Sequence, residues 1–187
     1  MKLFVATLLC AAACLAQTPK EKYMTPSRGD ASPPKETSVK FGDKEVWIVY
    51  HAPSVKGRKI FGSADALQKP GTTWRMGADW ATFLHTDADL TIGGVTVPKG
   101  EYTLYAMLDE GKWQLAISKQ TGQWGINRDG STTFDTSKAV GTAPMTMSKP
   151  PALVEQLSIK LTSTGAGKGK LTVEWENVSA SVDFTAK

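Results

Sequence analysis

The sequence predicts an all-β protein, an antiparallel β-sandwich of jelly-roll-like or Greek-key type with at most short helical turns. Two observations support this prediction. From Val39 onward, short runs alternate apolar and polar residues, and Gly, Pro and Asp separate these runs. Because such strands bury one face and expose the other, two sheets packed face to face are the economical arrangement.

The first half of this region contains the clearest strand signals. Val46–Tyr50 is rich in β-branched and aromatic residues. Ala81–Ile92 runs into Gly93-Gly94, a two-residue hairpin signal, before Val95–Val97. Two alternating segments follow, Glu101–Leu108 and Lys112–Lys119. We expect these consecutive segments from Ala81 onward to form one β-meander.

The second half repeats the alternation less tightly. Further strands are expected at Met145–Ser148, Leu157–Leu161, Leu171–Trp175 and Ser181–Phe184, with a glycine-rich hairpin tip at Gly165–Gly169. Only Pro151–Gln156 and Ala64–Gln68 are candidates for a helical turn.

The first sixteen residues are typical of a secretory signal peptide. Lys2 precedes the apolar run Leu3–Leu15, and small residues follow it. This run is shorter than the roughly 20 residues that span a bilayer, so we expect export to the periplasm or the exterior and no transmembrane helix in the mature chain. A lipid anchor at Cys14 is the less favoured alternative, because Ala11 stands where a lipobox usually has a branched apolar residue.

The remaining chain divides into a leader and one domain. Both cysteines lie within the signal peptide, so the mature chain has no thiol for a disulfide or a metal. Gln17–Ser38 is rich in proline and charged residues without apolar periodicity, which predicts a flexible leader. We expect residues 39–187 to form a single β-sandwich domain.

Composition and motifs exclude several functions. The 22 basic residues are scattered among 18 acidic ones, and the net charge is +4, so no basic stripe indicates a nucleic-acid partner. There is no phosphate loop, dinucleotide fingerprint or Gly-x-Ser-x-Gly elbow. We therefore predict no catalytic residues and no cofactor, and the oligomeric state is left open.

Two stretches carry residues suited to ligand binding. His51–Gly62 leaves a strand as a basic, glycine-punctuated loop, where cationic side chains and main-chain amides could converge on an anion. Trp74–Trp80 places Arg75, whose planar fork suits a carboxylate, between indole rings. If the stretches fold side by side, one cleft is lined by Tyr50, His51, Lys56, Arg58, Trp74, Arg75 and Asp79.

Each stretch also has a structural interpretation. The first could be a solvated loop in which Arg58 pairs with a nearby carboxylate. In the second, Arg75 and Asp79 could pair with each other and hold a loop shut. His85, Asp87 and Asp89 alternate and could share one strand face, but their spacing matches no zinc or calcium motif, so no metal site is predicted.

These stretches also carry a family resemblance. The segments Tyr50–Gly62, Trp74–Asp79, Val97–Leu104 and Gln123–Gly125 occur in an order similar to that of the exported bacterial proteins grouped as domain of unknown function 2911. The resemblance covers roughly Ser38–Phe184 and implies an exported, mostly antiparallel β domain with no established activity. Family members usually have Asn and a polar residue where this chain has Asp79-Trp80, and a different connection where it has Ala64–Thr73.

We therefore expect a non-enzymatic exported protein that binds a polar ligand, such as a glycan or a cell-envelope component. One alternative is a hydrolase that uses Asp79 with His51 or His85. Another is a purely structural envelope protein.

Overall fold

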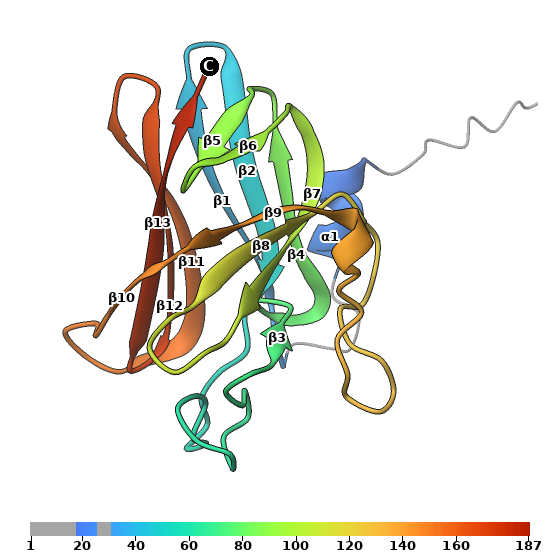
Figure 1. Ribbon diagram of the computed structural model, residues 1–187, viewed down its shortest axis with the longest axis vertical. Helices are drawn as coiled ribbons and strands as arrows, with labels where there is room; N and C mark the ends of the chain where they lie inside the picture. Colours follow the sequence, from blue (N-terminus) through green and yellow to red (C-terminus); the bar gives the residue numbers. More distant parts are fainter. Residues whose placement is uncertain (1–17, 26–30) are drawn as a thin grey trace, which may run out of the picture.

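Two antiparallel β-sheets packed face to face make up the body of the protein (Figure 1). The structure is a computed structural model that describes residues 18–25 and 31–187. The predicted all-β sandwich is confirmed. The predicted signal peptide, residues 1–16, lies outside the described residues, and within them no helix is long and apolar enough to cross a bilayer.

The first sheet has the strand order β1-β2-β4-β7-β8-β9, and β3 also pairs with β7. Its strands are β1 (Pro34–Phe41), β2 (Lys44–His51), β3 (Thr73–Trp74), β4 (Ala78–Thr86), β7 (Gly100–Met107), β8 (Gln114–Ser118) and β9 (Ala139–Pro144).

The second sheet has the order β11-β12-β13-β5-β6, and β10 also pairs with β13. Its strands are β5 (Leu90–Ile92), β6 (Val95–Val97), β10 (Thr146–Ser148), β11 (Val154–Gly165), β12 (Lys168–Glu176) and β13 (Val178–Ala186).

The expected single meander is wrong, although the hairpin at Gly93-Gly94 is confirmed. The β5–β6 hairpin crosses to the second sheet, where β5 pairs with β13, and β4 pairs directly with β7. The chain leaves the first sheet after Thr86, whose hydroxyl donates to the Ala88 carbonyl at 2.7 Å and closes a tight turn. Period-two alternation identifies a strand but does not specify its partner.

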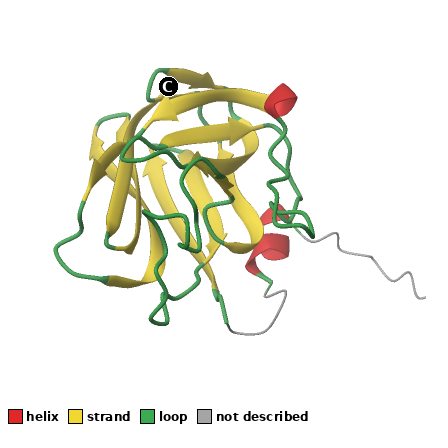
Figure 2. Cartoon of the chain, turned by 60° about the horizontal axis from the view of Figure 1, so that its bottom comes forward, coloured by secondary structure: helices red, strands yellow, loops and turns green. Residues whose placement is uncertain are grey.

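Within the described residues, helical structure is limited to α1 (Pro19–Met24) and the 3-10 helix η1 (Thr136–Lys138), both at one side of the sheets (Figure 2). The sequence did not predict either helix. Neither predicted helical turn is present, since residues 154–156 belong to β11 and residues 64–68 form turns and bends.

The expectation of a flexible leader at Gln17–Ser38 is wrong for two of its parts. Helix α1 has a capping box between Thr18 and Glu21, and β1 begins at Pro34. Tyr23 of α1 is buried on the outer face of the first sheet, where its ring stacks on Phe83 with centroids 4.3 Å apart. Burial of this aromatic side chain supplies the apolar contact that the leader's composition did not indicate.

An aromatic cluster closes the core at the end of the sandwich that contains β3, the strand to which Trp74 belongs. It consists of Phe61, Trp74, Trp113 and Trp175, with Trp74 and Trp175 stacked at 5.7 Å and Phe61 and Trp113 in edge contact at 4.8 Å. The segment that joins β2 to β3, residues 52–72, hangs below both sheets at this end (Figure 1, teal). The cluster therefore lies where this long connection meets the core.

Candidate functional site

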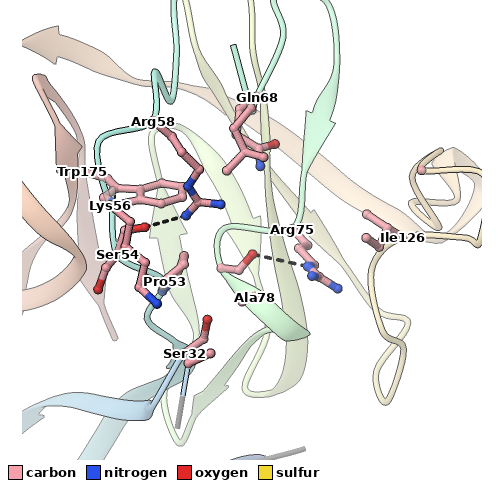
Figure 3. A pocket seen from close by; sticks show the side chains of 14 residues that line it. Ser32, Pro53, Ser54, Lys56, Arg58, Gln68, Arg75, Ala78, Ile126 and Trp175 are labelled. Carbon is pink, nitrogen blue, oxygen red and sulfur yellow. Dashed lines mark hydrogen bonds between the residues drawn. The ribbon is translucent and has the colours of Figure 1, made fainter. Parts of the chain in front are cut away.

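A cavity of about 570 Å³ lies beside the β2–β3 connection (Figure 3). The walls come from the segment before β1, from this connection, from the turn before β4, from the loop after β8 and from the end of β12. The lining residues are Ala31, Ser32, Pro53, Ser54, Lys56, Arg58, Leu67, Gln68, Arg75, Gly77, Ala78, Ile126, Gly130 and Trp175. Three of the seven predicted ligand-binding residues, Lys56, Arg58 and Arg75, are brought together here.

Main-chain hydrogen bonds to β11 hold the basic loop in place. The Val55 N–H donates to the Glu155 carbonyl at 2.7 Å, and the Leu157 N–H donates to the Pro53 carbonyl at 2.9 Å. The Lys56 N–H donates to the Glu155 carboxylate at 2.9 Å. The loop is therefore fixed to the second sheet, although the side chains of Lys56 and Arg58 are exposed.

The guanidinium group of Arg58 is oriented by its own loop. Nε donates to the Val55 carbonyl at 3.0 Å, and one terminal nitrogen donates to the Ser54 carbonyl at 2.6 Å. Among the described residues Arg58 forms no ion pair, so the predicted alternative of a partner carboxylate is not what the structure contains.

Arg75 stabilises the turn that follows it. One terminal nitrogen donates to the main-chain carbonyls of Asp79 at 2.7 Å and Trp124 at 2.8 Å, and Nε donates to that of Gly77 at 3.3 Å. Its guanidinium carbon lies 5.3 Å from the centroid of a Trp124 ring. Arg75 thus connects the turn before β4 with the loop after β8 while it also lines the cavity.

The other four predicted residues, Tyr50, His51, Trp74 and Asp79, are buried and do not line the cavity. The Tyr50 hydroxyl accepts the Ile159 N–H at 3.0 Å, which joins the two sheets. Burial raises the pKa of this hydroxyl above its ordinary value, although the hydrogen bond from Ile159 opposes the rise. Tyr50 is therefore a core residue that connects the two sheets.

His51 and Asp79 form a buried pair behind the cavity wall. His51 is 1% exposed, and its Nδ1 lies 3.3 Å from the Asp79 carboxylate and 3.3 Å from the Ser32 carbonyl. Nε2 lies 3.0 Å from the Tyr23 carbonyl. His51 thus contacts helix α1 through Tyr23 and the segment before β1 through Ser32. Ser32 also lines the cavity.

Trp74 lies in the aromatic cluster, and its neighbour Trp175 reaches the cavity instead. Both indole N–H groups are buried without an acceptor in the described part of the chain. The sequence placed Trp175 in a strand but gave no signal that the end of this strand borders a site.

Sequence reasoning missed further lining residues for different reasons. Ser32 fell within the expected flexible leader. Leu67 and Gln68 belong to the connection that differs from the family pattern, and Ile126 and Gly130 lie in a loop without a recognised motif. No local pattern indicated that these segments meet.

The His85 region is structural in character. The His85 ring stacks on Trp47 with centroids 4.9 Å apart, and Nε2 lies 3.1 Å from the Asp87 carboxylate. The Glu45 N–H and His85 hold the pKa of Asp87 below its ordinary value. The described residues contain no group of three or more His, Cys, Asp and Glu that could hold a metal ion.

Comparison with known proteins agrees with the predicted resemblance. The family described as "Protein of unknown function (DUF2911)" matches residues 32–184, which is most of the chain. No curated protein and no solved structure matches the chain. The resemblance is thereby confirmed.

Proposed function

We propose that this chain, which belongs to the DUF2911 family, is an exported binding protein that holds a polar ligand, such as a glycan or another cell-envelope component. The observation that carries the proposal is the cavity of about 570 Å³ lined by Lys56, Arg58 and Arg75. Its volume falls within the roughly 300–1,000 Å³ of small-molecule sites, and its walls mix apolar surface with a few convergent polar groups.

The rigidity of the walls supports a binding role. The basic loop is hydrogen-bonded to β11, and the turn that contains Gly77 and Ala78 is held by Arg75. A preformed site loses little conformational entropy when it binds, so more of the contact energy appears as affinity.

The hydrolase alternative has weaker support. His51 and Asp79 are adjacent, but both are buried, and both ring nitrogens of His51 lie against oxygen atoms of the protein. His85 contacts Asp87 rather than Asp79. A general base needs hydrogen-bond reach to a substrate, which neither pair offers in this arrangement.

The test is a binding screen with matched variants. Purified wild type, Arg58→Gln and Lys59→Gln are compared on a glycan array and in pull-down by cell-wall preparations. Lys59 is the matched control, because it is exposed on the same loop but does not line the cavity. We expect wild type and Lys59→Gln to retain the same ligand and Arg58→Gln to lose it.

Three outcomes would count against the proposal. If Arg58→Gln binds as wild type does, the cavity is not the site. If no preparation is bound, and none raises the melting temperature, the structural envelope protein becomes the better interpretation. Turnover of an arrayed glycan, lost in Asp79→Asn while folding is retained, would instead favour the hydrolase.

A further inference from the structure

We infer that the ligand of this cavity is an anionic sugar, one that carries a carboxylate or a phosphate group, and that Lys56 and Arg58 bind the anionic group. The inference rests on the proposed function and narrows its ligand from polar molecules in general to one charge class.

The charge of the lining is the first argument. Three cationic side chains line the cavity, and the fourteen lining residues that the structure describes include no Asp or Glu. Neither Lys56 nor Arg58 forms an ion pair with any described residue. Two carboxylates contact this loop, and each accepts a main-chain N–H: Glu155 that of Lys56 and Glu176 that of Phe61. Lys56 and Arg58 are two cations on one loop of a concave site, and neither is neutralised by an ion pair within the described residues, so their charge attracts an anion.

The geometry of Arg58 is the second argument. A guanidinium group has five N–H donors, and the carbonyls of Ser54 and Val55 accept from two of them. These bonds fix the plane of the group and leave three donors without an acceptor among the described residues. A planar fork held in this way suits bidentate binding of a carboxylate or a phosphate.

Arg75 has a different part in the site. Its donors are engaged by main-chain carbonyls of Gly77, Asp79 and Trp124, so it adds positive charge to the far wall while it keeps the turn in shape. Figure 3 shows Lys56 and Arg58 on one side of the hollow and Arg75 on the other. The anionic group is therefore assigned to the side of Lys56 and Arg58.

The remaining walls favour a sugar over a free ion. Pro53, Leu67 and Ile126 contribute apolar surface, and Ser32, Ser54 and Gln68 contribute polar surface. Trp175 also lines the cavity (Figure 3). A sugar ring has both apolar C–H surface and hydroxyl groups, whereas an inorganic anion would leave these walls unused.

The test uses three sugars with one ring and different groups at carbon 6. Glucose, glucuronate and glucose 6-phosphate are titrated into the full-length mature protein by isothermal titration calorimetry at low and high salt. We expect at least one of the two acids to bind tenfold or more tightly than glucose, with affinity that falls as salt rises. Comparison of glucuronate with glucose 6-phosphate shows whether the Arg58 guanidinium group prefers a carboxylate or a phosphate.

Variants locate the interaction. Lys56→Gln and Arg58→Gln are expected to weaken binding of the preferred acid by tenfold or more, Arg58→Lys by less, and the control Lys59→Gln by under twofold. Equal binding of glucose and the two acids would overturn the inference, although the proposed function would stand. The same conclusion would follow if neither acid bound and the glycan screen identified a neutral ligand. An equal loss in Lys59→Gln would also overturn it, because the effect would then reflect the net charge of the loop.

Discussion

Replacing Arg75 with methionine separates the structural role of this residue from a role in ligand contact. Methionine retains the apolar stem that packs against Gly125. This contact is close, since a Cβ atom on residue 125 would lie 2.6 Å from the Arg75 Cβ. It removes the guanidinium group, which donates to the carbonyls of Gly77, Asp79 and Trp124. The turn that these bonds hold includes Met76 and Asp79 at φ values of 59° and 55°, a region that costs energy for residues other than glycine.

The expected loss follows from the number and quality of these bonds. A hydrogen bond to a charged group contributes about 1.5–3 kcal/mol when buried. Arg75 is only half-buried and water can replace part of its interactions, so we expect a total loss of about 2 kcal/mol. For a domain of this size, that loss lowers the melting temperature by about 4–8 °C.

Urea unfolding followed by tryptophan fluorescence measures the change directly. Arg128→Met is the matched control, because Arg128 is exposed in the loop after β8, and its substitution should change stability by no more than about 0.5 kcal/mol. If Arg75→Met destabilises the fold no more than this control, the structural role argued for Arg75 is wrong.

Three further substitutions test other parts of the structure. Tyr50→Phe leaves the buried Ile159 N–H without its acceptor and should cost about 1–2 kcal/mol in urea unfolding at neutral pH. Burial raises the pKa of Tyr50 above the ordinary value of 10.0, so the folded protein holds the phenolic proton more tightly than the unfolded chain does. The contribution of this group to the free energy of unfolding is therefore fully present below pH 10 and is lost as the pH rises through the folded-state pKa. This alkaline loss should be smaller in Tyr50→Phe, and an equal loss would contradict the assignment. Gly169→Ala brings a Cβ to 2.3 Å from the Phe184 ring and should lower the free energy of unfolding by about 1–3 kcal/mol. No loss of stability would contradict the pairing of β12 with β13. His51→Ala removes the contacts to the Tyr23 and Ser32 carbonyls and should speed proteolysis of the N-terminal segment at least severalfold, whereas unchanged protection would show that His51 does not hold it.

Much of the fold could be predicted from local sequence patterns. Alternation located most strands, and Gly93-Gly94 located a hairpin, because both depend on residues that are close in sequence. The assignment of β5 and β6 to the second sheet could not be predicted in this way, since it depends on pairing with β13 near the other end of the chain.

The prediction of a flexible leader at the N-terminus was wrong for a different reason. The capping box of α1 was present in Thr18 and Glu21, but a helix of six residues is not stable by itself. Its stability depends on Tyr23, which packs against Trp47, Val49 and Phe83 on the outer face of the first sheet. Composition alone could not reveal this tertiary contact.

The candidate site was predicted in part. Lys56, Arg58 and Arg75 do line one cavity, because loop residues with charged side chains stay at the surface. Tyr50 and His51 do not, because β2 is buried on both faces from Val46 to His51 and alternation gives no exposed position there. Trp175 was missed because only the tertiary structure brings the end of β12 to the basic loop.

A nitrogen-15 NMR titration of the tryptophan indole groups tests the central claim most directly. With resonances assigned by single Trp→Phe variants, glucuronate and glucose 6-phosphate are added to the labelled protein. Binding in the cavity predicts that the Trp175 resonance and the Arg58 Nε resonance shift together, while Trp47, on the outer face of the first sheet, stays unchanged. Shifts confined to Trp47, Trp80 or Trp124, with Trp175 and Arg58 unmoved, would place the ligand elsewhere and contradict the account.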